Sequence, residues 1–277
     1  MSNKGLIMDK IINKKAAGEK IVVLTAYDYA MAVLADKAGV DILMVGDSVG
    51  MVFAGHQSTI PVSMQDMIYH TQAVSRAAEK AVVVADLPFG SYHISMEQAV
   101  ENALLLIQEG GADVVKLECN WQTLPILQRL TALGIPVMGH IGLLPQTAAL
   151  FGGYRVQGKD EASAMALVDI AVAIEEAGAF YLVLECVTSE AAKVIGEKID
   201  IPTIGIGAGA FCDGQVLVSY DLLGLTQGRI PHFAKKYANL SAEISRAFTE
   251  YIDDVKSGRF PSASHSFAMD EDEARKL

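Results

Sequence analysis

The strongest constraint on the fold is a set of short apolar runs, rich in Val, Ile and Leu, that recurs along the chain. Most of the runs are continuous rather than alternating, which is typical of parallel strands covered on both faces. The predicted strands are IVVLTA from Ile21, DILMVGD from Asp41, AVVVADLP from Ala81, DVVKLE from Asp113, PVMGHIG from Pro136, FYLVLE from Phe180, PTIGIGAG from Pro202 and QVLVSYD from Gln215.

Segments of helical character separate these runs. Their apolar residues recur at steps of three and four, as in YAMAVLADKAG from Tyr29, SMEQAVENALLLIQEGG from Ser95 and EASAMALVDIAVAIEEAG from Glu161. Several end in Gly or Ala-Gly just before the next strand, which is typical of a left-handed helix C-cap. Eight strands with intervening helices predict an α/β fold of the (β/α)8 type, and a doubly wound open sheet is the competing arrangement.

The predicted domain organisation is simple. No Pro/Gly/Ser linker or composition shift divides residues 1–261, which we assign to a single (β/α)8 barrel domain with a short N-terminal helical extension. Residues 262–277 are polar and acidic, and we expect this tail to be flexible. The opening residues contain several lysines and no apolar central segment, so we expect no secretory signal and a cytoplasmic location.

Charge and cysteine content narrow the class of partner. Asp and Glu total 33 against 22 Lys and Arg, and the net charge of −11 argues against broad attraction to nucleic acid or to an anionic membrane. The sequence therefore favours small-molecule partners. The three cysteines, Cys119, Cys186 and Cys212, show no paired spacing, which fits reduced thiols better than a disulfide framework or a zinc cluster.

Acidic residues stand at the ends of four predicted strands: Asp47, Asp86, Glu118 and Glu185. In a barrel of this type the active site lies at the carboxyl ends of the strands. One such acid alone is readily a helix N-cap or a solvated loop residue. Four on one rim repel each other and need a cation or a shared proton, and oxygen ligands favour Mg2+ over Zn2+.

Two further side chains lie on these strands. Lys116 stands two residues before Glu118 and therefore points to the same face, the barrel interior, where it either neutralises an acid or contacts a substrate. His140 belongs to the fifth strand, and a single histidine there is a structural hydrogen-bonding group or a catalytic one. For the glycines of GIGAG near residue 207, close packing is the preferred explanation and a phosphate-binding loop the alternative.

Long strings in the chain resemble the ketopantoate hydroxymethyltransferase family. The longest is LTAYDYAMAVLADKAGVDILMVGDSVGMVFAGHQSTIPVSMQDMIYH from Leu24. VVADLPFGSYH, VVKLE, GHIGLLPQTAALFGGYRVQGK, YLVLECV, PTIGIGAG, DGQVLVSYDLLGL and PHFAKKY follow in the family's order, so that the resemblance covers roughly Leu24 to Pro261. Agreement over strings of this length is far more specific than a single short motif.

The resemblance implies a Mg2+-dependent transfer of a hydroxymethyl group from 5,10-methylenetetrahydrofolate to 3-methyl-2-oxobutanoate, through a Mg2+-stabilised enolate. The product, ketopantoate, belongs to pantothenate and coenzyme A synthesis. The expected protein is a TIM barrel of the phosphoenolpyruvate/pyruvate type in a cytoplasmic homo-oligomer, usually a decamer. By motif, the metal ligands are Asp47, Asp86 and Glu118, the substrate contacts are Asp47, Ser48, Asp86 and Lys116, and the proton acceptor is Glu185, with Lys116 and His140 as further catalytic candidates.

The sequence departs from the family pattern at two places. Cys119 and Asn120 replace a Gly-Gly pair after the rim acid, and Thr188 replaces a frequent Pro, so side chains in these loops are expected to narrow the pocket or alter the approach of the folate. Two alternative functions stay open. One is a related Mg2+-dependent lyase or carboligase acting on 2-oxo acids, which would need no folate, and the other is a barrel kept as a non-catalytic binding protein.

Overall fold

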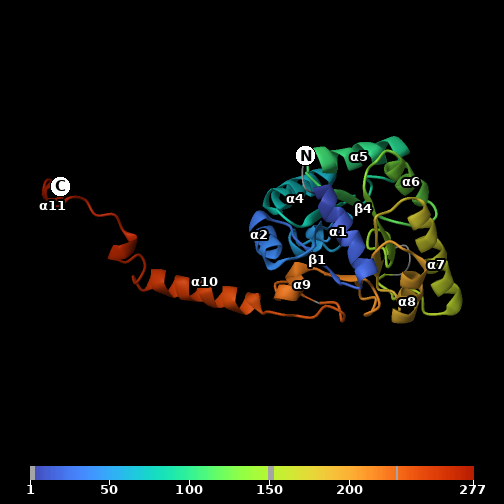
Figure 1. The fold of residues 1–277 in the computed structure, drawn as a ribbon. Helices are drawn as coiled ribbons and strands as arrows, with labels where there is room; N and C mark the ends of the chain where they lie inside the picture. Colours follow the sequence, from blue (N-terminus) through green and yellow to red (C-terminus); the bar gives the residue numbers. More distant parts are fainter. Residues whose placement is uncertain (1–3, 149–152, 229) are drawn as a thin grey trace.

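The computed structural model describes residues 4–148, 153–228 and 230–277. Eight parallel strands form a closed barrel in sequence order, and β8 pairs with β1 (Figure 1). This closure confirms the (β/α)8 barrel and excludes the open sheet. The strands are β1 (Ile21–Thr25), β2 (Ile42–Val45), β3 (Val82–Asp86), β4 (Val114–Glu118), β5 (Val137–Gly142), β6 (Tyr181–Glu185), β7 (Thr203–Ile206) and β8 (Gly214–Leu217).

Helices surround the barrel and cover most of its outer face (Figure 1). Those up to the eighth strand are α1 (Lys4–Ala17), α2 (Tyr29–Ala38), α3 (Val49–Val52), α4 (Met64–Ala77), α5 (Met96–Gln108), α6 (Leu124–Ala132), α7 (Glu161–Glu176) and α8 (Ser189–Lys198). After β8 come α9 (Ser219–Leu223), α10 (Leu240–Lys256), the 3-10 helix η2 (Ala263–His265) and α11 (Glu271–Ala274). Since α1 precedes the first strand, the predicted N-terminal helical extension is confirmed.

Two apolar layers hold the barrel together. The inner layer includes Ile42, Val84, Met138 and Tyr181, and Ile11 of α1 packs into it. A larger layer lies between the strands and the helices, and it forms because successive strand residues point to opposite faces. The interior of the barrel is therefore a packed core rather than a pore, and polar chemistry is confined to its ends.

The strand register brings the predicted site residues on β3 to β6 together at one end of the barrel. Asp86 pairs with Lys116, Glu118 with His140, and Gly142 with Glu185. Asp86, Glu118, Gly142 and Glu185 are the last residues of their strands, and Lys116 and His140 lie two residues before the ends of theirs. The glycines after β7 serve packing, as expected, because a Cβ on Gly207 would lie 2.7 Å from the ring of Phe233.

The C-terminal helix α10 is not packed into the barrel as the preceding helices are. α10 projects away from the barrel in Figure 1, and none of its residues is buried. The division into a barrel domain at 1–261 and a flexible tail at 262–277 stays a prediction. Within the described ranges, no helix has both the length and the apolar character needed to cross a bilayer.

Candidate functional site

The acids at the ends of β2, β3 and β4 form a buried cluster around a lysine. Asp86 accepts a hydrogen bond from the backbone N–H of Asp47 at 3.2 Å, and the same carboxylate oxygen lies 3.0 Å from Nζ of Lys116. Asp47, Asp86, Lys116 and Glu118 are each less than 8% exposed. Lys116 thus neutralises Asp86, which is one of the two roles expected for this side chain from the sequence. It also faces the barrel interior.

His140 joins this cluster to the fourth rim acid. Nε2 of His140 lies 3.2 Å from Oε2 of Glu185, although the N–H direction is poorly aligned with that oxygen. On the other side of the ring, Nζ of Lys116 lies 3.5 Å from Nδ1. Since an ammonium only donates, Nδ1 is the acceptor and the proton of the neutral ring belongs on Nε2, facing Glu185.

Local backbone geometry fixes the direction of Glu185. Cys186, the next residue, has φ 48°, a left-handed conformation that residues other than glycine adopt rarely. Its N–H donates to the carbonyl of Ile206, and its carbonyl accepts from the N–H of Gln157. Strain of this kind persists where surrounding structure holds it, often at functional sites.

Ser48 lies beside Asp47 at the start of α3. Its hydroxyl is 2.8 Å from the hydroxyl of Tyr27, a fully buried residue that follows β1. This contact orients Ser48 Oγ at the edge of the carboxylate cluster. Desolvation raises the pKa of Tyr27 well above its ordinary value, so its phenol stays protonated and serves as a hydrogen-bonding partner.

Gln146, which the sequence reasoning did not single out as a site residue, lies in the middle of the cluster. Its backbone N–H donates to Oε1 of Glu118 at 2.9 Å, and its side-chain amide donates to Oδ2 of Asp47 at 2.8 Å. The amide oxygen accepts from the hydroxyl of Tyr92 at 2.7 Å. A residue in a loop after β5 therefore ties together the ends of β2 and β4.

The cluster carries more negative than positive charge. Burial first, and then the neighbouring Asp86 carboxylate, raise the pKa of Asp47 to about 7. Burial also raises the pKa of Glu118 to about 8. Burial alone would lower the pKa of Lys116, but attraction to Asp86 and Asp47 raises it above the ordinary value.

The donor set fits a hard divalent cation. Oδ1 of Asp86 and Oε2 of Glu118 are buried and have no hydrogen-bond partner in the described structure. Buried carboxylate oxygens without partners are costly and call for a positive ligand. Among residues 4–148, 153–228 and 230–277, however, no group of three or more His, Cys, Asp or Glu side chains is placed to hold a metal ion by itself. Mg2+ suits such a site because it takes few protein carboxylates and completes its shell with water and substrate.

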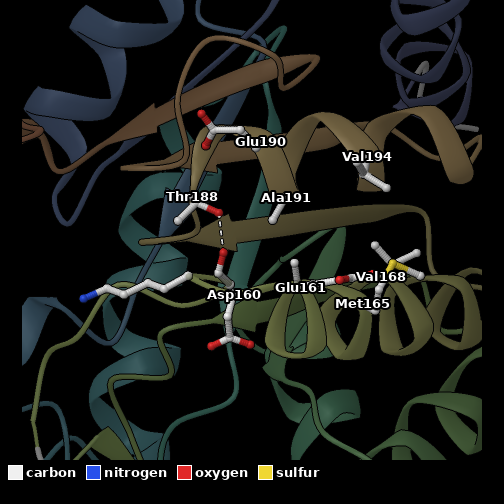
Figure 2. A pocket seen from close by; sticks show the side chains of 11 residues that line it. Asp160, Glu161, Met165, Val168, Thr188, Glu190, Ala191 and Val194 are labelled. Atoms are coloured by element: carbon white, nitrogen blue, oxygen red, sulfur yellow. Dashed lines mark hydrogen bonds between the residues drawn. The ribbon is translucent and has the colours of Figure 1, made fainter.

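The side chains that differ from the family pattern point away from the carboxylate cluster. Cys119 lies in the apolar layer behind β4, and burial raises its thiol pKa to about 12. The side chain of Asn120 accepts from the N–H groups of Gln122 and Thr123 in its own loop. Thr188 donates to the carbonyl of Gly158 at 2.6 Å, seen as the dashed line in Figure 2. The expectation that these side chains narrow the pocket is therefore not supported by where they point.

A hollow separate from the carboxylate cluster lies between α7 and α8 and is the one drawn in Figure 2. Met165, Val168, Ala191 and Val194 form its apolar walls. It contains none of the rim residues Asp47, Asp86, Glu118 or Glu185. We therefore place the candidate active site at the strand ends and not in this groove.

Comparison with known proteins agrees with the site and the fold. A family model described as ketopantoate hydroxymethyltransferase matches residues 6–263. The chain belongs to this family. It is therefore an enzyme of the transferase class, a hydroxymethyltransferase built on a (β/α)8 barrel, as the resemblance implied.

Two relatives show how closely the chain follows the family. The 3-methyl-2-oxobutanoate hydroxymethyltransferase of Syntrophus aciditrophicus (strain SB) is 56% identical over 91% of this chain and 93% of the relative. The protein of the same name from Enterococcus faecalis (strain ATCC 700802 / V583) is 51% identical over 95% of this chain and 96% of the relative.

Solved structures of much lower sequence identity share the fold. A phosphonopyruvate hydrolase superposes with a TM-score of 0.60 at 13% identity, covering 99% of this chain and 94% of the other. A 2,3-dimethylmalate lyase, described as a member of the PEP mutase/isocitrate lyase superfamily, gives 0.56 at 13% identity, covering 98% and 93%. These similarities support the barrel fold, and the assignment to the phosphoenolpyruvate/pyruvate type stays a prediction.

Proposed function

We propose that the enzyme transfers a hydroxymethyl group from 5,10-methylenetetrahydrofolate to 3-methyl-2-oxobutanoate, giving ketopantoate for pantothenate and coenzyme A synthesis. The observation that carries the proposal is the arrangement of Glu185 next to a buried cluster of Asp47, Asp86, Lys116 and Glu118. A base beside a charged pocket is what removal of a proton next to a ketone requires.

The reaction begins at C3 of the 2-oxo acid. Glu185 accepts the C3 proton, and the electron pair of the C–H bond moves into a C2–C3 double bond, giving an enolate. Water adds to the folate-borne methylene carbon, the two bonds from this carbon to folate nitrogens break, and the two water protons pass to those nitrogens, which releases tetrahydrofolate and leaves the carbon as formaldehyde. C3 of the enolate attacks this carbon, so a C–C bond forms while the C=O electron pair moves to oxygen, and this oxygen takes the proton from Glu185 to become the hydroxyl.

The other rim residues bind and orient the keto acid. Lys116, with its pKa raised above the ordinary value, keeps a positive charge near the developing oxyanion. Ser48 Oγ, held by Tyr27, donates to the substrate carboxylate, and Asp47 and Asp86 line the same pocket. These roles are the ones that the family resemblance implies for these four positions.

His140 orients the base. Burial and the nearby Lys116 lower the pKa of His140, so the imidazole is neutral at neutral pH. A neutral ring with its proton on Nε2 stabilises the Glu185 carboxylate without protonating it permanently. We therefore assign to His140 a positioning role next to the proton acceptor.

Asp47, Asp86 and Glu118 are the residues that would hold Mg2+. Bound there, the ion would supply Lewis-acid stabilisation of negative charge on the substrate oxygens. The partnerless oxygens of Asp86 and Glu118 support this assignment. As partners we propose the two small-molecule substrates and further copies of the chain in a cytoplasmic homo-oligomer, with a decamer as the expected size, and neither nucleic acid nor membrane.

The test is product formation from 3-methyl-2-oxobutanoate under three omissions: no folate, no Mg2+ and no enzyme. We expect ketopantoate only when all components are present. Product or substrate cleavage without folate would instead support the related 2-oxo-acid lyase or carboligase. A folded protein that binds neither Mg2+ nor the keto acid would support a non-catalytic barrel.

A further inference from the structure

The two oxygens of a rim carboxylate differ in their surroundings. Oδ2 of Asp86 accepts from the backbone N–H of Asp47 and contacts Lys116, whereas Oδ1 of Asp86 is buried without a partner in the described ranges. Glu118 repeats the pattern, because its Oε1 accepts from the backbone N–H of Gln146 and its buried Oε2 accepts from no described residue. Each of these two acids therefore has one oxygen held by the protein and one that is not.

Gln146 occupies one oxygen of two different acids. Its backbone N–H donates to Oε1 of Glu118 at 2.9 Å, and its side-chain amide donates to Oδ2 of Asp47 at 2.8 Å. Both contacts are shielded from water, since Gln146 is only 4% exposed. A single loop residue therefore determines which oxygen of Asp47 and which oxygen of Glu118 the protein itself uses.

The amide of Gln146 cannot turn over without losing hydrogen bonds. Its oxygen accepts from the hydroxyl of Tyr92 at 2.7 Å, and its NH2 group also donates to the carbonyl of Leu87 at 3.0 Å. Burial raises the pKa of Tyr92 well above its ordinary value, so the phenol keeps the proton that it donates. The amide is therefore held with its NH2 group, and not its oxygen, toward Asp47.

The partners of Gln146 come from separate parts of the barrel end. Gln146 itself follows β5, whereas its partners are Asp47 after β2, Leu87 and Tyr92 after β3, and Glu118 at the end of β4. A buried polar network in which every member is satisfied is rigid. The position of the amide is therefore set by the ends of the strands and not by a ligand that binds beside it.

The number of oxygens that a carboxylate offers distinguishes one divalent cation from another. Ca2+ takes about six to eight oxygen ligands in a flexible geometry and accepts both oxygens of one carboxylate. Mg2+ is smaller, requires a nearly octahedral geometry and keeps several waters, with one or two carboxylates as its protein ligands. A site in which each acid offers a single oxygen therefore suits Mg2+ better than Ca2+.

We propose that Gln146 is a positioning residue that selects the cation of the rim. By occupying one oxygen of Asp47 and one of Glu118, it limits each acid to a single oxygen and so favours Mg2+ over Ca2+. It acts through these acids and not by contact with the ion. The inference rests on the proposed function, since it concerns the cation that Asp47, Asp86 and Glu118 would hold.

The test removes the amide and keeps the length of the side chain. Gln146→Met frees Oδ2 of Asp47 but leaves the backbone N–H that holds Glu118. Electron paramagnetic resonance measures the affinity for Mn2+, the paramagnetic substitute for Mg2+, and competition with Mn2+ gives the affinity for Ca2+. In Gln146→Met the affinity for Mn2+ should fall about 10- to 100-fold, as for other groups that orient metal ligands. The affinity for Ca2+ should fall less, because Asp47 then offers it both oxygens.

Two further variants and a folding check complete the test. Gln128→Met, on the exposed side of α6, is the matched control and should change neither affinity. Tyr92→Phe frees the amide to turn and should shift the ratio of the two affinities in the same direction, but less. Circular dichroism checks that each variant folds.

The outcomes separate the selection from the metal site itself. An unchanged affinity for Mn2+ in folded Gln146→Met, or an equal loss for Mn2+ and Ca2+, would overturn the selection by Gln146. If Gln146→Met does not fold, an unshifted ratio in Tyr92→Phe overturns it as well. Wild type that binds neither cation, with or without 3-methyl-2-oxobutanoate, would instead refute the proposed metal assignment.

Discussion

The barrel rim and the C-terminal helix α10 depart in opposite ways from the usual distribution, in which polar groups are exposed and apolar groups are buried. At the rim, polar groups are buried without full partners, as Oδ1 of Asp86 and Oε2 of Glu118 show. On α10, apolar groups such as Phe248 are exposed without cover. Both situations are unfavourable in an isolated chain. At the rim, the proposed cation with its substrate would relieve the unfavourable burial.

The largest expected effect is at the rim. Glu185→Gln removes the proton acceptor with almost no change in shape, and we expect kcat to fall by about 10³-fold or more, within the range for loss of a catalytic group. Steady-state kinetics measures it. Glu190→Gln in the groove of Figure 2 is the matched control and should be neutral. Unchanged turnover of Glu185→Gln would remove it from the base role.

A second rim change tests the charge balance. Asp86→Ala removes the partner of Lys116 and one proposed Mg2+ ligand, so binding of both Mg2+ and the keto acid should weaken about 10- to 100-fold. Isothermal titration calorimetry measures both affinities. A variant that keeps the wild-type requirement for Mg2+ would contradict the metal assignment.

The third prediction concerns stability and pH. The folded-state pKa of Asp47, about 7, lies above its ordinary value of 3.8, so the folded protein binds more protons and loses stability as pH rises through this range. Asp47→Asn removes the titrating carboxyl group, and with it this loss of stability at rising pH. Without metal, the variant should gain about 3 °C or more in Tm over wild type at pH 8, and less at pH 5. Equal gains at both pH values would refute the raised pKa.

The smallest expected effect on stability is on the polar face of α10. Arg246 forms ion pairs with Glu243 and Glu250, but its side chain is 61% exposed. Exposed pairs of this kind contribute about 0.5 kcal/mol or less. Arg246→Ala should therefore change the Tm by no more than about 1 °C. A larger fall in Tm would show that these ion pairs contribute more than exposed pairs usually do.

The sequence predicted the barrel and the rim acids for the same reason. Continuous apolar runs are a strong signal for buried parallel strands, and an acid such as Asp86 directly after one has its place fixed by the strand. Gln146 gave no comparable signal, because a loop has no period from which the direction of a side chain can be read. The spacing of α10 marks an apolar face, but spacing alone does not show where the helix lies relative to the barrel.

The most direct test of the proposed chemistry follows the C3 hydrogen of 3-methyl-2-oxobutanoate by proton NMR in D2O with enzyme and Mg2+. We predict loss of the C3 signal with wild type and its retention with Glu185→Gln, and a new hydroxymethyl signal once 5,10-methylenetetrahydrofolate is added. Retention of the C3 hydrogen by folded wild type in the full mixture would contradict the assignment of the rim as a deprotonating site.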